Sequence, residues 1–414
     1  MESDVPGLRN VNWREALSIP RISQAIDAGF GSFSIPSLRK GRKCEAYSGR
    51  GHAAEVGLDP SAKPAARRSA QFDPASRGGP VRAAGGSCLP RPWLLPLVPV
   101  YRAVLGVKAW LTERGWLRRR RLGRPVISVG SVSAGGAGKT PVVLLLAELL
   151  GEAGFAVRIL SRGYGRGATV IERVDSGGDA ARFGDEPMLL ARRVRETGAV
   201  YVGADRYRAG ELAERDGAVD VFLLDDGFQH RKLSRDLDLV LLTRADAEDC
   251  LLPAGNLREP LRALRRADVV VVREEDAGLA GFVAEMCRGK VPEIWVIRRR
   301  LASASLPARP VVFSGIARPE SFVAMLAEAG CEAVAEVRFR DHHRYTEADI
   351  ERLVALARES GTDSFVTTEK DAVKLSARMR ERLGMVVVPQ LRVELVDEAA
   401  ALERVLKTVG RGSI

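Results

Sequence analysis

Short apolar runs alternate with helical patterns along the chain from residue 125 onward. Each run is rich in β-branched residues, and the runs are separated by segments with helical patterning. This alternation predicts an α/β fold in which a mostly parallel sheet has helices on both faces. The expected strands are VISVG from residue 126 and the runs at 155–160, 199–203, 219–226, 237–242 and 267–273.

A second, smaller α/β unit is expected near the C-terminus. The apolar runs PVVFSGI, EVRF and SFVTT are separated there by helical patterns that begin at Pro319 and Thr346. We place the boundary between residues 300 and 308 and interpret IWVIRRRL as the connection. The two predicted units are residues 125–305 and 306–414.

The chain before these units has a different pattern. Residues 1–87 are rich in Gly, Ser, Ala, Pro and Arg and lack a sustained apolar period, which predicts a mostly disordered extension. The start of the chain has no basic region followed by an apolar core and a cleavage site, so a secretory signal is not expected.

Residues 88–124 predict a helical segment that lies in a membrane interface. The stretch at 93–111, WLLPLVPVYRAVLGVKAWL, is strongly apolar, and Trp116 and a basic run from Arg118 to Arg121 follow it. Prolines and cations interrupt the apolar stretch, so shallow insertion into an anionic membrane surface is favoured over a spanning helix. The alternative is a core helix packed on the next domain.

The net charge of +11 is concentrated in the N-terminal part of the chain. Residues 1–87 carry 13 basic and 8 acidic side chains, and residues 88–124 carry 9 and 1. The predicted catalytic body is therefore close to neutral, which argues against nucleic-acid binding there. The five cysteines show no paired spacing, which is typical of a reducing cytoplasm rather than a disulfide or zinc framework.

The strongest chemical signal is the segment at 126–148, VISVGSVSAGGAGKTPVVLLLAE, where a strand, a glycine-rich turn and a helix are expected in succession. In a P-loop NTPase the backbone N–H groups of such a turn converge on phosphate oxygens, the lysine reaches the β- and γ-phosphates, and the hydroxyl residue binds Mg²⁺. Ser133 replaces the usual glycine, and a turn that binds no phosphate is the alternative. The residues expected around the phosphates are Ser133, Ala134, Gly135, Gly136, Ala137, Gly138, Lys139 and Thr140.

Asp225 and Asp226 end the apolar run VFLLDD, where a P-loop NTPase has its Mg²⁺-binding carboxylate. Ordinary strand-end carboxylates are the alternative. ATP is favoured over GTP because Thr-Glu-Lys-Asp at 368–371 has the wrong spacing for a guanine-reading motif. The ParA/MinD-like ATPases are disfavoured because Ala134 stands where they carry an extra lysine.

The loop is the first of seven motifs that occur in a fixed order. VGSVSAGGAGKTP is followed by SRGYG (161–165), GDEP (184–187), DDGFQH (225–230), LPAGNLREP (252–260), DHH (341–343) and TEKDAVK (368–374). Together these motifs resemble those of the tetraacyldisaccharide 4′-kinases, the lipid A 4′-kinases. Residues 1–87 lie outside the resemblance.

The resemblance implies a kinase that transfers the γ-phosphate of ATP to the 4′-hydroxyl of a tetraacylated glucosamine disaccharide 1-phosphate, giving lipid IVA. It implies ATP and Mg²⁺ as cofactors and a glycolipid acceptor in an anionic membrane as partner. A peripheral position on the cytoplasmic face of the bacterial inner membrane follows from that acceptor. No nucleic-acid or protein partner is expected.

The resemblance also implies roles for particular residues. Asp185 of GDEP is expected to accept the hydroxyl proton, oriented by His342, while Lys139 acts at the phosphates. An alternative for GDEP is a simple helix start before Pro187. His342 and His343 are not distinguished by the sequence, and a surface pair is their alternative. The expected metal-binding residues are Thr140, Glu186, Asp225 and Asp226.

A further group of residues is expected around the two substrates. Gln229 is assigned to the nucleotide site, and Glu259 to the acceptor site. Arg206 and Arg258 are expected to pair with the acceptor's 1-phosphate, for which a planar guanidinium is suited. Solvated surface arginines are the alternative reading of both positions.

Two rival functions share parts of these signals. A membrane-tethered regulatory P-loop ATPase would use the loop and the apolar segment, but it leaves GDEP, LPAGNLREP and TEKDAVK unexplained. A nucleic-acid ATPase would use the basic N-terminal part, but no aromatic residues are interleaved with basic ones there in the manner of such proteins.

Overall fold

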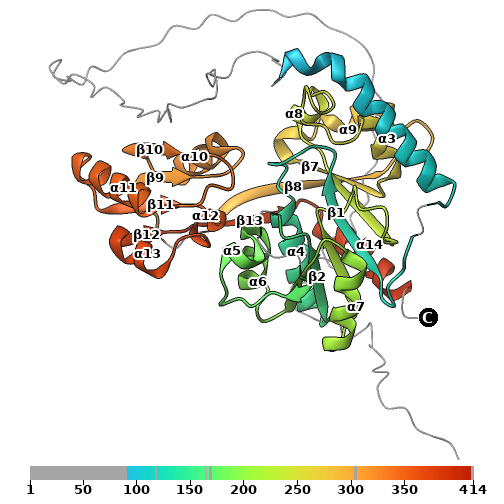
Figure 1. The fold of residues 1–414 in the computed structure, drawn as a ribbon, viewed down its shortest axis with the longest axis horizontal. Helices are drawn as coiled ribbons and strands as arrows, with labels where there is room; N and C mark the ends of the chain where they lie inside the picture. The colour runs from blue at the N-terminus through green and yellow to red at the C-terminus, as the bar shows by residue number, and fades with distance from the viewer. Residues whose placement is uncertain (1–90, 117–118, 165, 167–169, 303–304, 412–414) are drawn as a thin grey trace, which may run out of the picture. The chain divides into compact units, whose positions relative to one another are not determined.

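The computed structural model describes residues 91–116, 119–164, 166, 170–302 and 305–411 (Figure 1). The predicted extension at 1–87 and Arg118 of the basic run lie outside the described residues.

A nine-stranded sheet forms the larger part of the described chain, with the strand order β13-β8-β7-β6-β1-β5-β2-β4-β3. The strands from β8 to β4 in this order pair in parallel, and the two edge strands, β13 and β3, pair antiparallel. This sheet confirms the predicted fold class. The strands are β1 (Val126–Ser131), β2 (Val157–Ser161), β3 (Glu172–Arg173), β4 (Gly198–Val202), β5 (Val221–Asp225), β6 (Leu237–Leu241), β7 (Val269–Arg273), β8 (Glu293–Ala302) and β13 (Gln390–Leu395).

Apolar side chains cover both faces of this sheet because successive residues of a strand point to opposite sides. In β5, Leu223 belongs to the core cluster under α4, α6 and α14, whereas Phe222 and Leu224 belong to the cluster under α7. Val270 and Val272 of β7 pack in a third cluster with α9. The helices are α4 (Lys139–Glu152), α5 (Ala180–Phe183), α6 (Asp185–Arg193), α7 (Arg206–Asp216), α8 (Arg244–Ala247), η2 (Leu261–Arg266), η3 (Glu274–Asp276), α9 (Leu279–Met286) and α14 (Glu398–Arg411).

The segment IWVIRRRL is a strand of this sheet, and the prediction of a simple connection is wrong. It forms most of β8, which pairs with β7 along one side and with β13 along the other. Its alternating pattern is explained by partial burial, because Trp295 and Ile297 are buried in the core while Arg298 and Arg300 point to solvent and meet carboxylates.

The predicted C-terminal unit, residues 306–414, is too long. Its last two elements, β13 and α14, return to the nine-stranded sheet rather than to the smaller one. Ala401, Val405 and Val409 recur at helical spacing on α14 and pack in the core cluster that contains α4. The return is visible in Figure 1, where red β13 lies beside β8.

The smaller unit is a four-stranded parallel sheet with the order β10-β9-β11-β12. Its core contains Phe313 and Phe365 with Tyr345, Ile350 and Leu353. Its elements are β9 (Val311–Ser314), α10 (Pro319–Glu328), β10 (Ala335–Arg338), α11 (Glu347–Glu359), β11 (Ser364–Thr367), α12 (Glu369–Ala372), α13 (Ala377–Leu383) and β12 (Met385–Val387).

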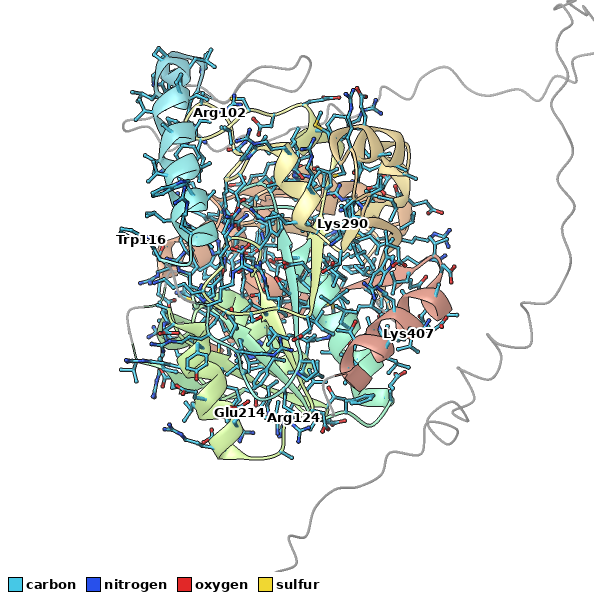
Figure 2. The ribbon with its side chains drawn as sticks, turned by 90° about the vertical axis from the view of Figure 1, so that its right-hand side faces the viewer. Arg102, Trp116, Arg124, Glu214, Lys290 and Lys407 are labelled. Carbon is cyan, nitrogen blue, oxygen red and sulfur yellow. The ribbon has the colours of Figure 1, made fainter. Side chains whose placement is uncertain are left out.

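The predicted interfacial segment begins with η1 (Pro92–Leu97) and continues as α3 (Val98–Glu113). Its residues Val98, Tyr101 and Leu105 pack against the core cluster that contains α9. A different set of apolar side chains is exposed, namely Trp93, Leu95, Leu97, Val100, Val104, Val107, Trp110 and Trp116. Figure 2 shows α3 running past Arg102 toward Trp116.

These exposures do not fit a helix buried in the core, although one side of α3 packs on the larger unit. By length and composition alone, Pro92–Thr112 could cross a membrane, since it has 21 residues and a mean hydropathy of 1.4. None of its most apolar window is buried. Among the described residues, the segment therefore leaves an apolar face exposed.

Candidate functional site

The glycine-rich turn lies between β1 and α4, as the sequence predicts. Gly135, Gly136 and Gly138 have φ values of 80°, 66° and 89°, in the left-handed region where a side chain is strained. The N-cap of α4 is Gly138, so no side chain accepts a hydrogen bond from the first N–H groups of the helix. A turn of free amides at a helix N-terminus fits an anion such as a polyphosphate.

The LPAGNLREP segment holds the turn in place. The N–H of Ala134 donates to the carbonyl of Asn256 at 2.8 Å, and Ser133 forms a β-bridge with Leu257. The N–H of Arg258 in turn donates to the carbonyl of Val132 at 2.8 Å. This motif therefore stabilises the turn from outside, a role that the sequence does not reveal.

Lys139 lies among polar groups at the end of β1. Its Nζ is 3.3 Å from Oδ1 of Asp226 and 3.4 Å from Oγ of Ser131. Nη1 of Arg258 lies 2.7 Å from the other carboxylate oxygen of Asp226. Burial alone would raise the pKa of Asp226, but Lys139 and Arg258 lower it below its ordinary value. Asp226 is thus an ionised carboxylate between two cations.

Asp225 is almost fully buried at the carboxyl end of β5. Its carboxylate accepts a hydrogen bond from Oγ of Ser161 at 3.0 Å. Burial, and then the negative charges of Glu186 and Asp226, raise the pKa of Asp225 to about 7. A divalent cation would offset this repulsion, so the environment of Asp225 fits the predicted Mg²⁺ role.

The donors for such a cation are few. Thr140 is the second residue of α4, and Glu186 is the second residue of α6. Within the described ranges, no cluster of three or more His, Cys, Asp or Glu side chains could hold a metal by itself. Mg²⁺ in proteins usually binds one or two carboxylates and completes its coordination shell with water and substrate phosphates. A site with few protein ligands therefore fits this ion.

Asp185, the first residue of α6, meets His342, which lies in the loop after β10 of the smaller unit. Nδ1 of His342 lies 2.9 Å from Oδ2 of Asp185, whose side chain is 7% exposed. Burial would raise the pKa of Asp185, but the hydrogen bond from His342 and the charge of Lys370 bring it below the ordinary value. The same hydrogen bond raises the pKa of His342, against the opposing effect of burial. Asp185 is therefore held as a carboxylate, available to accept a proton.

The structure distinguishes the two adjacent histidines. Nε2 of His343 lies 3.0 Å from the carboxylate of Asp349, and its ring stacks on Phe339 with centroids 4.6 Å apart. His343 thus belongs to the smaller unit, whereas His342 reaches Asp185. Among the described residues, the non-glycine residues with left-handed φ are His342 and Asp226, at 61° and 52°. Strained backbone of this kind concentrates at functional sites.

Lys370 is a site residue that the sequence reasoning missed. Its Nζ lies 3.3 Å from Nε2 of His342, 3.2 Å from Asp341 and 3.4 Å from Glu186. The neighbouring Glu369 pairs with Arg193 of α6 at 2.9 Å. The TEKDAVK motif of the resemblance contains both side chains, and its lysine is the signal in the sequence.

The four residues assigned around the substrates have different surroundings. Nε2 of Gln229 donates to the carbonyl of Ser131 at 2.8 Å, at the end of β1. Arg206 is 4% exposed, and burial lowers its pKa to about 10, so it is not a solvated surface arginine. Glu259 is also buried and pairs with Arg266 at 2.8 Å. Arg258 is more exposed than Arg206 and Glu259, and it lies next to Asp226.

A parallel sheet with a phosphate-binding turn after β1, a carboxylate at the end of β5 and an acid–histidine pair defines a P-loop phosphotransferase. The family model of the tetraacyldisaccharide-1-P 4′-kinases matches residues 90–410. The chain therefore belongs to the tetraacyldisaccharide-1-P 4′-kinase family, and it is a kinase.

Individual relatives agree with this membership. The tetraacyldisaccharide 4′-kinase of Koribacter versatilis is 42% identical over 76% of this chain and 98% of its own length. That of Geobacter metallireducens is 40% identical over 74% of this chain and 95% of its own. A crystal structure of LpxK from Aquifex aeolicus in complex with ATP is 32% identical, with a TM-score of 0.63, over 77% of this chain and 98% of that one.

Proposed function

We propose that the chain transfers the γ-phosphate of ATP to the 4′-hydroxyl of a tetraacyldisaccharide 1-phosphate, forming lipid IVA in lipid A biosynthesis. The observation that carries this proposal is the 2.9 Å contact between Asp185 and His342, close to the carboxylates that are expected to bind Mg²⁺. Glu186 follows Asp185 directly, and its charge acts on Asp225. A base for an alcohol acceptor therefore lies next to the groups that would hold the phosphates.

The positive charge of Lys139 and the N–H groups of the turn suit the binding of the nucleotide phosphates. They would bind the phosphate oxygens and stabilise the negative charge that develops on them during transfer. Thr140 and Asp225 would hold Mg²⁺, with Asp226 and Glu186 as further carboxylates. When bound, Mg²⁺ supplies additional charge neutralisation at the phosphates.

Asp185 would accept the proton of the 4′-hydroxyl as the hydroxyl oxygen bonds to phosphorus and the bond to the β–γ bridging oxygen breaks. His342 donates through Nδ1 to Asp185 and so fixes the direction of the carboxylate. Lys370 faces the other ring nitrogen, Nε2, and holds the ring from the opposite side. In this mechanism Asp185 touches the acceptor, and His342 positions it.

Arg258 remains our candidate for the acceptor's 1-phosphate, because it is the most exposed arginine of the group. We assign supporting roles to Arg206, which is buried near Asp225, and to Glu259, which pairs with Arg266. Gln229 is assigned to the support of β1 beneath the nucleotide site.

The two histidines offer a matched comparison. His342→Ala is expected to lower kcat by about tenfold to a hundredfold, because Asp185 loses its orienting partner. Loss of that hydrogen bond also raises the pKa of Asp185, so the acidic limb of the pH–rate profile moves to higher pH. His343→Ala is expected to leave the limb in place. Steady-state transfer rates from about pH 3 to pH 9, a range that includes the ordinary carboxyl pKa, check both, and equal profiles for the two variants contradict the assignment.

Acceptor dependence separates the kinase from the regulatory ATPase. ADP release measured with and without tetraacyldisaccharide 1-phosphate in detergent micelles is expected to require the acceptor. Rapid ADP release that is unaffected by the acceptor would favour the regulatory ATPase instead.

We further propose that α3 binds the anionic surface of the cytoplasmic face of the inner membrane without spanning it. The exposed residues Val100, Val104 and Val107 recur at helical spacing on the side away from the core cluster. Arg102 and Lys108 on the same helix, and Arg114 directly after it, would contact anionic headgroups. The enzyme could then reach a four-chain lipid acceptor while the acyl chains of that acceptor stay in the bilayer.

Charged substitutions on this face test the membrane proposal. The triple variant Val100→Asp, Val104→Asp, Val107→Asp is expected to lose most binding to vesicles that contain anionic lipid, as measured by flotation. Activity on a short-chain, soluble acceptor should stay within about twofold, since no site residue is changed. Val291→Asp, at an exposed valine in the loop between α9 and β8, is the matched control. Undiminished flotation of the triple variant would contradict the proposal.

A further inference from the structure

A loop of the smaller unit lies directly against the phosphate-binding turn. It joins β9 to α10 and contains Ala317 and Arg318. A Cβ atom added to Gly136 would lie 3.1 Å from Nε of Arg318 and 3.4 Å from Cβ of Ala317. A side chain at this position would crowd the loop, so the guanidinium of Arg318 lies close to the turn.

Arg318 has no acidic partner in the part of the chain that the structure describes. Its Nη2 donates a long hydrogen bond of 3.4 Å to Oγ1 of Thr243. By contrast, Arg273 and Arg299 nearby both meet Glu275, at 3.6 Å and 2.7 Å. A half-buried guanidinium without a carboxylate is well suited to an external anion.

The anion that this position fits is the end of a nucleotide polyphosphate. The turn amides of Gly135 and Gly136 are the groups that receive phosphate oxygens in a P-loop, and Arg318 lies against that turn. Lys139 points from α4 toward Ser131 and Asp226, on β1 and at the end of β5. Arg318 comes from the smaller unit instead, so it would supply a second cation from outside the phosphate-binding turn.

We propose that Arg318 binds the γ-phosphate of the nucleotide and so acts as a phosphate-binding residue contributed by the smaller unit. This inference rests on the proposed function, because it requires ATP at the turn. A guanidinium at the transferred phosphate stabilises the charge that spreads over the phosphoryl oxygens. Neither the sequence motifs nor their resemblance single out this arginine.

A structural connection links Arg318 with the acid–histidine pair. The N–H of His342 donates to the carbonyl of Gly315 at 3.3 Å, in the loop that carries Arg318. The N–H of Gly315 donates to the buried carboxylate of Asp371 at 3.0 Å. A phosphate bound by Arg318 would therefore also stabilise the β9–α10 loop, whose Gly315 accepts the hydrogen bond from the backbone of His342.

The test is nucleotide binding to the full chain without acceptor, measured by calorimetry with Mg²⁺ and a non-hydrolysable ATP analogue or ADP. Arg318→Ala is expected to raise the Kd of the analogue about tenfold or more and that of ADP by less than about threefold. Arg318→Lys, which keeps the charge, should fall between. Arg338→Ala is the matched control, because Arg338 lies on the same small sheet and pairs with Glu336 at 2.9 Å. An unchanged melting temperature without nucleotide checks that each variant is folded.

Equal affinity of wild type and Arg318→Ala for the analogue would overturn the proposal and leave the proposed kinase function intact. Equal losses for the analogue and for ADP would overturn the assignment to the γ-phosphate. Failure of the wild type to bind either nucleotide would overturn both this proposal and the proposed function.

Discussion

Replacing Asp185 by asparagine is expected to lower kcat by about 10²- to 10⁴-fold while nucleotide affinity changes little. Asparagine keeps the shape of the side chain and can still meet His342, but it cannot accept the hydroxyl proton. The hydrogen bond from His342 and the charge of Lys370 keep the pKa of Asp185 below its ordinary value, so the wild-type group is ionised at neutral pH. Steady-state transfer at saturating ATP and acceptor measures the change.

Asp179→Asn provides the control for this substitution. Asp179 lies six residues earlier and caps α5, where it accepts a hydrogen bond from the N–H of Ala181 at 2.9 Å. Its replacement should leave kcat within about twofold, since asparagine also caps helices well. If Asp185→Asn kept near-wild-type kcat, Asp185 would have no part in the proton transfer.

Lys139→Met is expected to lower kcat by about 10²- to 10³-fold and to weaken nucleotide binding as well. The variant removes the ammonium group beside Asp226 and Ser131 but retains the apolar stem of the side chain. Asp226 keeps Arg258 at 2.7 Å, so its carboxylate is not left buried without a partner and the chain should remain folded. Transfer rates and nucleotide Kd, measured on the same preparation, separate the two effects.

Lys290→Met is the corresponding control, because Lys290 is an exposed lysine that pairs with Asp268 at 2.9 Å. Exposed pairs contribute little, so both transfer and nucleotide affinity should be unchanged. Activity of Lys139→Met within about threefold of wild type would exclude a role for Lys139 at the phosphates.

The strands of the parallel core could be predicted because each is a compact apolar run. The run VFLLDD, for instance, becomes β5 with both faces buried. Its two aspartates lie at the carboxyl end of the strand, Asp225 as the last residue and Asp226 directly after it. The phosphate-binding turn was equally readable, since its glycines and its lysine must follow one another in the chain. Local sequence determines these features, so one sequence sufficed to find them.

The edge of the sheet could not be predicted in the same way. The alternation in EIWVIRRRLA reflects a half-buried strand whose outer partner, β13, comes about ninety residues later. Such a pairing depends on tertiary contacts rather than on local pattern. A consequence follows for deletions: a chain that ends at residue 305 loses β13 and α14 as well as the smaller sheet, so its inactivity would not identify the role of His342.

Most residues of the candidate site could be predicted from the sequence, but the contacts between them could not. The resemblance placed Asp185 and His342 together, and the structure adds which ring nitrogen faces the carboxylate. Lys370 and Arg318 were missed because each lies far in sequence from the groups it contacts. Arg206 could be read as a surface arginine because burial of a long cation is not visible in a sequence.

The most direct test of the kinase function is transfer of labelled γ-phosphate from ATP to tetraacyldisaccharide 1-phosphate in mixed micelles, with Lys139→Met measured in parallel. We predict a labelled lipid with one more phosphate at the 4′-position, formed by the wild type and almost absent with the variant. A wild-type protein that binds ATP and the acceptor but yields no labelled lipid would contradict the kinase function.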